Sequence, residues 1–159
     1  MLEHRYHLDL PHPPARVWAL MQDYPRWTEY APMVERVEVL HPGDAAGDGL
    51  LRRVSYKLPL GRKGCALELV TAVEPAAGYT YTMISRAPGN DQSGHVRLEP
   101  REGGSATRLH FDERYQLTGL PWRWFERQIY GFINRQNERS MQALSDWLSA
   151  HPEYRADLA

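Results

Sequence analysis

One long amphipathic pattern near the end of the chain constrains the fold more than any other feature. Between Trp122 and Trp147, apolar residues recur at steps of three and four, the spacing that places side chains on one face of a helix. The stripe consists of Phe125, Ile129, Phe132, Ile133, Gln136, Ser140, Leu144, Trp147 and Leu148. Pro121 suits the first helical turn, and His151-Pro152 predicts the end of the helix. Such a helix is stable only against a partner surface.

The sequence before this helix predicts seven strands that can form the partner surface. From Leu2 to Leu10, apolar and polar residues alternate, which is typical of a half-buried strand. Six further segments have strand composition: Val34 to Leu40, Leu50 to Leu58, Leu67 to Glu74, Tyr79 to Ile84, Gly94 to Pro100 and Thr107 to Leu117. The connections contain Gly, Pro, Asn and Asp, which favour turns. Because they are short, we expect antiparallel pairing, since parallel strands need crossovers of about a dozen residues or more.

Two short helices are predicted between the first strand and the second. Pro13-Pro14 can start one of them, and Asp23 suits the N-cap of the next, which ends near Tyr30. We expect Trp18 and Trp27, one on each helix, to pack across one end of the sheet as a gate or plug. The order strand, two short helices, six strands and long helix is that of the helix-grip fold. We therefore expect an α+β protein whose curved, seven-stranded antiparallel sheet wraps around the long C-terminal helix.

Composition and charge exclude several classes of function. At 159 residues the chain has the size of one domain. We assign residues 1–150 to a single helix-grip ligand-binding domain and residues 151–159 to a C-terminal tail, which we expect to be loose after Pro152. The formal net charge of −1 gives no electrostatic argument for binding nucleic acid. No stretch approaches the ~20 apolar residues of a membrane span. We therefore expect a cytoplasmic protein without integral membrane association.

The cysteine and histidine positions indicate neither a disulfide nor a metal site. Cys65 is the single cysteine, which excludes an internal disulfide and a cysteine-built metal site. His4 and His7 are three apart on a strand and therefore point to opposite faces. His110 and Asp112 share a face, but it is the outward one. The chain lacks a Gly-x-Ser-x-Gly motif, and the segment 61–64 reads as a hairpin turn rather than a phosphate loop. We expect no metal and no other cofactor.

Several segments of the sequence resemble a known superfamily. They are Pro13 to Leu20 with Asp23-Tyr24, Trp27 with Ala31 to Val34, Gly47 to Val54, Val96 to Pro100, and Gly103-Gly104 before Thr107 to Leu109. They resemble the START/Bet v 1-like (SRPBCC) superfamily, and most of all its bacterial polyketide cyclase/dehydrase and lipid-transport branch. The resemblance covers residues 2–149. It implies the helix-grip fold and a cavity for a hydrophobic small molecule, while its motifs are structural and do not identify an activity.

Glu113 is the anomaly on the last strand. Alternation places it between Phe111 and Tyr115 on the apolar face, which should point toward the long helix and any cavity. A buried carboxylate is costly unless it is paired, and desolvation raises its pKa. Such a group suits a general base or a polar hook for a ligand. The alternative is that Glu113 lies near the strand end and reaches solvent, or pairs with an arginine such as Arg53.

Further polar candidates lie on the strands before it. Arg52 shares its face with leucine, valine and tyrosine, whereas Arg53 lies on the opposite face with leucine and serine. The apolar neighbours favour Arg52 as the inner residue, where its planar fork would orient a carboxylate, phenolate or enolate oxygen. Tyr79, Tyr81 and Met83 form another inward set. Tyrosines of this kind either line a cavity and bind a polar ligand, or fill the core.

The long helix supplies the opposite wall of the expected cavity. Ile133 belongs to its apolar stripe, and we include Met141 and Asn137 among the residues facing a ligand. Gly131 in mid-helix costs about 1 kcal/mol relative to Ala. It allows either the close approach of a strand or room for a ligand.

Our leading hypothesis is a carrier or sequestering protein that binds a lipid or an aromatic polyketide between sheet and helix. Such pockets are mainly apolar, with a few polar groups that fix orientation. The candidate ligand-binding residues are Tyr81, Met83, Arg52, Phe111, Tyr115, Ile133, Asn137 and Met141, and the candidate catalytic residue is Glu113.

Two alternatives remain open at this point. The first is a polyketide cyclase or dehydratase, which would need one acid/base group in the same cavity. The second is a quinone-chaperone-like or protein-partner module without catalysis, which would need an exposed apolar rim. Trp122, Trp124 and Phe125 would form that rim, or the mouth of the cavity, unless they are packed in the ordinary way. The sequence does not identify the ligand or the oligomeric state.

Overall fold

The computed structural model describes residues 2–57, 61–84, 90–117, 124 and 126–154. Its elements are β1 (Leu2–Leu10), α1 (Pro14–Gln22), the 3-10 helix η1 (Tyr24–Arg26), α2 (Trp27–Tyr30), β2 (Val34–His41), β3 (Leu51–Lys57), β4 (Lys63–Glu74), β5 (Gly78–Met83), β6 (Asn90–Arg101), η3 (Glu102–Gly104), β7 (Ala106–Leu117) and α3 (Glu126–Ala150). This confirms the predicted helix-grip fold and its order of elements.

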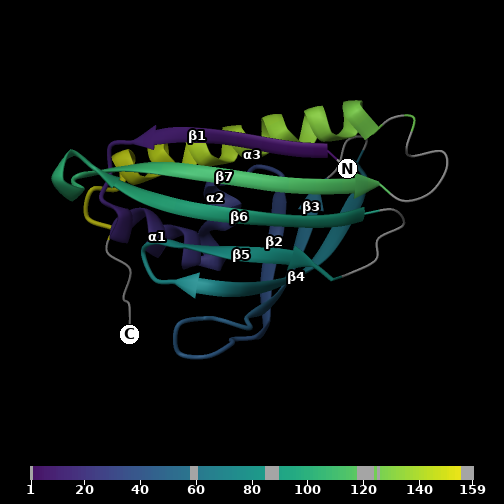
Figure 1. Ribbon diagram of the computed structural model, residues 1–159, viewed down its shortest axis with the longest axis horizontal. Coiled ribbons are helices and arrows are strands. Elements are labelled where there is room, and N and C mark those ends of the chain that lie inside the picture. The colour runs from purple at the N-terminus through teal and green to yellow at the C-terminus, as the bar shows by residue number, and fades with distance from the viewer. Residues whose placement is uncertain (1, 58–60, 85–89, 118–123, 125, 155–159) are drawn as a thin grey trace.

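The seven strands form one antiparallel sheet in the order β1-β7-β6-β5-β4-β3-β2. Strands β2 to β7 follow one another as a meander, and β1 adds to its far edge by pairing with β7. The sheet is curved, so that β1 and β7 run along α3 while β2 and β3 cross the view at a steep angle (Figure 1). Helices α1 and α2 both contact α3.

Some boundaries differ from the sequence prediction. Strand β4 begins at Lys63 rather than Leu67, and β6 begins at Asn90 rather than Gly94. Both extensions come from pairing, because the neighbouring strand continues: Lys63 pairs with Lys57, and Asn90 with Leu117. The turn-forming residues of these segments favour loops by themselves, but their strand partners hold them in the sheet.

The start of the long helix is described only in part. α3 is described from Glu126, while Pro121, Trp122 and Phe125, on which part of the prediction rests, lie outside the described residues. Trp124 is 78% exposed, so the expectation that the tryptophan cluster is packed in the ordinary way is wrong for this residue. Among the described helices, none has the length and apolar character needed to cross a membrane.

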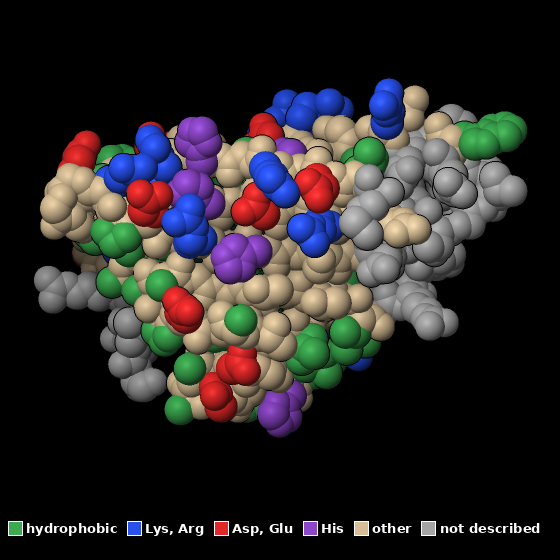
Figure 2. Space-filling model, viewed as in Figure 1, with side chains coloured by type: hydrophobic (Ala, Val, Ile, Leu, Met, Phe, Trp, Pro, Cys, Tyr) green, Lys and Arg blue, Asp and Glu red, His purple; other side chains and the backbone are tan. Residues whose placement is uncertain are grey.

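The two faces of the sheet differ as the alternation predicts. Over β1, β7 and β6, the outer face carries a mixture of basic, acidic and histidine side chains (Figure 2). These include the pairs Arg5–Asp112 (3.5 Å), Arg108–Asp9 (2.7 Å) and His110–Glu99 (2.8 Å). The inner face carries buried apolar residues such as Val54, Val70, Val96, Leu98, Leu109 and Phe111. Any apolar site is therefore on the side of α3.

Tyr154 is packed, so the expectation of a loose chain after Pro152 is wrong for this residue. The Tyr154 hydroxyl donates to Asp23 (2.9 Å), and its ring meets Trp147 edge-on with centroids 5.1 Å apart. Trp147 in turn donates its indole N–H to Glu29 on α2 (2.9 Å). These contacts fasten the short-helix segment to α3. Residues 155–159 of the predicted tail lie outside the described residues.

Candidate ligand-binding site

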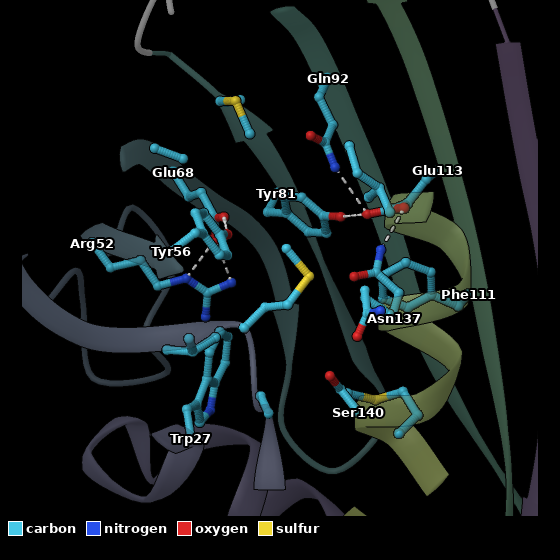
Figure 3. A pocket seen from close by; sticks show the side chains of 18 of the residues that line it. Trp27, Arg52, Tyr56, Glu68, Tyr81, Gln92, Phe111, Glu113, Asn137 and Ser140 are labelled. Atoms are coloured by element: carbon cyan, nitrogen blue, oxygen red, sulfur yellow. Dashed lines mark hydrogen bonds and ion pairs between the residues drawn. The ribbon is translucent and has the colours of Figure 1, made fainter. Parts of the chain in front are cut away.

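A cavity lies between the inner face of the sheet, α3 and the short helices. Its volume is about 300 Å³, at the lower end of the ~300–1,000 Å³ that small-molecule pockets occupy. Its walls are largely aromatic and apolar, and they include Met21, Trp27, Tyr30, Met33, Tyr79, Tyr81, Met83, Phe111, Ile133 and Met141. Two groups of polar side chains interrupt these walls on opposite sides (Figure 3).

The first polar group is centred on Glu113 of β7, which is only 2% exposed. Three donors from three different elements reach its carboxylate (Figure 3). The Tyr81 hydroxyl on β5 and the Gln92 amide on β6 (3.0 Å) donate to Oε1, and the Asn137 amide on α3 (3.0 Å) donates to Oε2. Glu113 therefore links the sheet to the long helix inside the cavity.

A glycine makes this arrangement possible. Gly94 of β6 pairs with Tyr81 on one side and with Glu113 on the other. A Cβ atom at this position would lie 2.4 Å from Cε1 of the Tyr81 ring, closer than carbon atoms can approach. Because Gly94 has no side chain, the Tyr81 ring can lie across β6 and bring its hydroxyl to Glu113.

Burial dominates the electrostatics of Glu113. Desolvation raises the pKa of its carboxyl from the ordinary 4.5 to about 7, although the hydrogen bonds from Tyr81, Gln92 and Asn137 oppose the shift. Burial and the neighbouring Glu113 charge raise the pKa of the Tyr81 hydroxyl well above its usual range. The alternative of a pair with Arg53 is wrong, because Arg53 contacts Glu38 (3.0 Å) instead. Glu113 therefore populates both protonation states near neutral pH.

The second polar group is a buried ion pair. Arg52 on β3 is 2% exposed, as its apolar neighbours in the sequence indicate. Its Nε and Nη2 donate to Oε2 of Glu68 on β4 at 2.8 Å each, and the Tyr56 hydroxyl donates to Oε1 (3.0 Å). Sequence reasoning missed Glu68 and Tyr56 as site residues. The signal for Glu68 was present, because Ala66, Glu68 and Val70 alternate on one face as Glu113 and its neighbours do.

Aromatic rings enclose the rest of the Arg52 guanidinium. Its carbon lies 4.5 Å from the ring centre of Trp27, 5.2 Å from Tyr24 and 5.8 Å from Tyr79. Nη1 is buried and has no hydrogen-bond partner among the described residues. Arginine stacked on aromatic faces in this way is held by cation–π attraction. Arg52 therefore fixes the short-helix wall of the cavity, in addition to its pairing with Glu68.

The structure brings most of the predicted site residues together. Tyr81, Glu113 and Asn137 are in direct contact, and the same cavity is lined by Arg52, Met83, Phe111, Ile133 and Met141. Tyr115 is the exception and does not line the cavity. Its ring stacks on Tyr130 with centroids 4.3 Å apart, and its hydroxyl donates to Asn134 (3.1 Å). Tyr115 is paired with Leu2 near the end of β7, where the first turns of α3 cover it.

Two further cavity residues escaped the sequence reasoning. Gln92 lies in a segment adjoining the predicted turn, so no strand face was assigned to it. Tyr6 is on the inner face of β1 and lines the cavity, and its hydroxyl is buried without a hydrogen-bond partner among the described residues. In the part of the chain that the structure describes, no group of three His, Cys, Asp or Glu side chains could hold a metal ion.

Comparison with known proteins identifies the family. A sequence profile of the family described as polyketide cyclase/dehydrase and lipid transport matches residues 1–151. The chain belongs to this family. A search of curated proteins gave no match. Together with the helix-grip fold, membership supports a role in hydrophobic ligand binding or in cyclase chemistry.

Solved structures agree on the fold of this family member. The Zhui aromatase/cyclase from a Streptomyces species is similar with a TM-score of 0.80 at 15% identity, over 94% of each chain. The Thermus thermophilus protein TTHA0849 is similar with a TM-score of 0.76 at 20% identity, over 94% of this chain and 98% of its own. A START superfamily protein from Mycobacterium smegmatis has a TM-score of 0.77 at 10% identity, over 92% and 98%. At such identities the likeness extends to the fold alone.

Proposed function

We propose that this protein binds a hydrophobic small molecule with an aromatic ring system in the cavity between the sheet and α3, as a carrier or sequestering protein. The observation that carries the proposal is the cavity itself, about 300 Å³ of space with aromatic walls and two polar groups on opposite sides. Apolar walls provide affinity through burial, and a few placed polar groups provide orientation.

The aromatic lining favours a planar ligand over a flexible chain. The rings of Tyr6 and Phe111 lie 5.2 Å apart between centroids, and those of Phe111 and Tyr81 lie 6.5 Å apart. Rings at such distances interact in offset or tilted geometry, and a flat ligand can extend the same contacts. Trp27 at the other side of the cavity is a built-in reporter of binding, because its indole lines the wall.

The test is a cavity-filling variant with a matched control on the same helix. Ser140 of α3 lines the cavity, whereas Gln142 two residues later is exposed. We expect Ser140→Phe to abolish the quenching of tryptophan emission by aromatic polyketides and the retention of a ligand in native mass spectrometry. Gln142→Phe adds the same ring in solvent and should leave both unchanged. Equal behaviour of the two variants, or no binding across a broad panel of aromatic and lipid ligands, would refute the proposal.

A second candidate function is cyclisation with loss of water, favoured by the pKa of Glu113 near 7, which burial causes. As a carboxylate, Glu113 would take a proton from a carbon beside a ketone, and that carbon would bond to a second carbonyl carbon. The protonated Glu113 would return the proton to the new alkoxide. A second proton taken from the same carbon would then leave with the hydroxyl as water. Under this proposal, Glu113→Gln abolishes turnover of a polyketone and preserves its binding; unchanged turnover would exclude it.

A further inference from the structure

The ionisable groups that line the described cavity carry an unequal charge. Apart from the exposed Cys65, they are tyrosines, Arg52, Glu68 and Glu113. Arg52 and Glu68 neutralise each other at 2.8 Å. In the described part of the chain, the donors to Glu113 are the neutral groups of Tyr81, Gln92 and Asn137. The cavity is therefore neutral when Glu113 is protonated and carries one negative charge when it is ionised.

The arginine is poorly placed to receive an anionic ligand. Two of its three nitrogens donate to Glu68, and the third points away from Glu68 toward Trp27 (Figure 3). This third nitrogen is buried against the rings that surround the guanidinium. A ligand carboxylate would have to displace Glu68 and leave it buried without its counter-charge, which is strongly unfavourable.

The Glu113 side of the cavity has the opposite properties. A carboxylate has about four lone-pair positions, and among the described residues Oε2 accepts only from Asn137. The hydroxyl of Tyr6, on the same lining, is buried and has no hydrogen-bond partner among the described residues. The rings of Tyr6, Phe111 and Tyr81 succeed one another beside Glu113, and aromatic faces attract cations. Free acceptors and aromatic faces together fit an ammonium group.

We infer that the cavity prefers an aromatic ligand bearing a protonated amine over the neutral or carboxylate analogue of the same shape, with the ammonium held by Glu113 and the Tyr6 hydroxyl. This inference rests on the proposed binding function and names the charge class of its ligand. The ammonium would restore neutrality to the ionised cavity, and the aromatic body would occupy the apolar remainder between Trp27 and Met141.

Binding of such a cation is coupled to a proton. The titratable groups around Glu113 come from four other strands, and they are His4 and Tyr6 of β1, Tyr56 of β3, Glu68 of β4, and Tyr79 and Tyr81 of β5. His4 is the register partner of Glu113, and its Nε2 lies 3.0 Å from the carboxylate of Glu138 on α3. The groups of β6 and α3 that donate to Glu113 are the neutral amides of Gln92 and Asn137. Burial raises the pKa of every one of these tyrosines, so they stay neutral at pH 6–8. Of the carboxyl groups and the imidazole named here, Glu113 is the one that lines the cavity without a counter-ion, so it must lose its proton when the ammonium binds.

The experiment uses three naphthalene probes of similar size, which carry a positive charge, no charge and a negative charge: 2-naphthylmethylamine, 2-naphthylmethanol and 2-naphthoate. Affinities are measured by calorimetry at about pH 6 and about pH 8 in buffers of different ionisation enthalpy. We expect the amine to bind at least about tenfold more tightly than the carboxylate at the higher pH. Because the ionised fraction of a group with pKa about 7 rises about tenfold over this interval, amine affinity should rise by about the same factor, with release of close to one proton at the lower pH.

Glu113→Gln and Asp112→Asn form the matched pair of variants, since Asp112 is the preceding residue on the outer face of β7. The first should remove the amine preference and the proton release, and the second should preserve both. The proton release of the unmodified protein tests the inference even where a variant fails to fold. If the carboxylate binds as tightly as the amine, or if amine binding releases no proton, the inference is refuted while the proposed binding function stands. If none of the three probes binds, the inference is refuted, and the broader ligand panel decides the proposed binding function.

Discussion

Replacement of Glu113 by Gln should change how the stability of the protein depends on pH. Burial raises the pKa of this carboxyl from 4.5 to about 7 in the folded state. A group with a raised folded pKa contributes stability that is fully present below its unfolded pKa and is lost as the pH rises through the folded value. The contribution of Glu113 should therefore be lost between about pH 4.5 and about pH 8, because unfolding releases this carboxyl to ionise in water.

The size of the effect follows from the two pKa values. A difference of about 2.5 between 4.5 and 7 corresponds to about 3 kcal/mol at 1.36 kcal/mol per pKa unit. Glu113 is 2% exposed, so solvent screening does little to reduce this figure. Gln has the same shape and does not ionise, and the variant should lack this part of the pH dependence. Relative to the unmodified protein, it should thus gain about 3 kcal/mol across this range.

The assay is urea unfolding followed by tryptophan emission at several pH values. The quantity of interest is the difference in unfolding free energy between the unmodified protein and the variant, because other titrating groups cancel in it. Asp112→Asn serves as the control, since it removes a half-exposed carboxylate from the opposite face of the same strand. Parallel curves for the unmodified protein and Glu113→Gln would refute the reasoning, because they would mean that Glu113 titrates alike in the folded and unfolded states.

Two further predictions concern the packing around the cavity. Gly94→Ala should destabilise the protein by about 1–3 kcal/mol, the usual cost of overpacking, because the new methyl group meets the Tyr81 ring. In urea unfolding, this loss of stability should be smaller when Tyr81 is also replaced by Leu. An equal loss in the Tyr81→Leu background would exclude the contact with the ring as its cause. Arg52→Met should cost about 3–5 kcal/mol by leaving Glu68 buried without a counter-charge. The double variant Arg52→Met, Glu68→Leu should recover most of that loss in thermal unfolding, and no recovery would show that Arg52 acts through its aromatic contacts instead.

The sequence predicted those features that depend on local periodicity. Alternation along one strand sufficed to assign Glu113 to the inner face of the sheet. The apolar residues that share a strand face with Arg52 assigned Arg52 to the inner face as well. The apolar stripe of α3 likewise follows from spacing alone, and Leu144 and Leu148 of that stripe are fully buried. Each of these inferences needs only the neighbours of a residue along the chain.

The partners of Glu113 could not be predicted in the same way. Its contact with Tyr81 depends on the registers of two strand pairs, β5–β6 and β6–β7, which place Gly94 between them. Periodicity does not determine register, because a shift by two residues preserves every face. The strand-interior glycine was the available signal, since such glycines often mark the close approach of another group. The prediction that Tyr115 lines the cavity was wrong for a related reason. Its side chain is on the predicted face of the sheet, but its position along β7 is too near the end of the strand to reach the cavity.

Two buried carboxylates facing one cavity have different roles because their partners differ in charge. Glu68 has a permanent counter-ion in Arg52, which lies 2.8 Å away and remains charged at all physiological pH values. The donors that reach Glu113 from the described residues are neutral, and its negative charge is therefore the one that solvent exclusion penalises. A ligand can relieve that penalty by bringing a positive charge, and a substrate can exploit it by exchanging a proton. The two proposed functions, ligand carrier and cyclase, thus have the same physical requirement. Both need a buried carboxylate that is not paired with a cationic side chain as Glu68 is with Arg52.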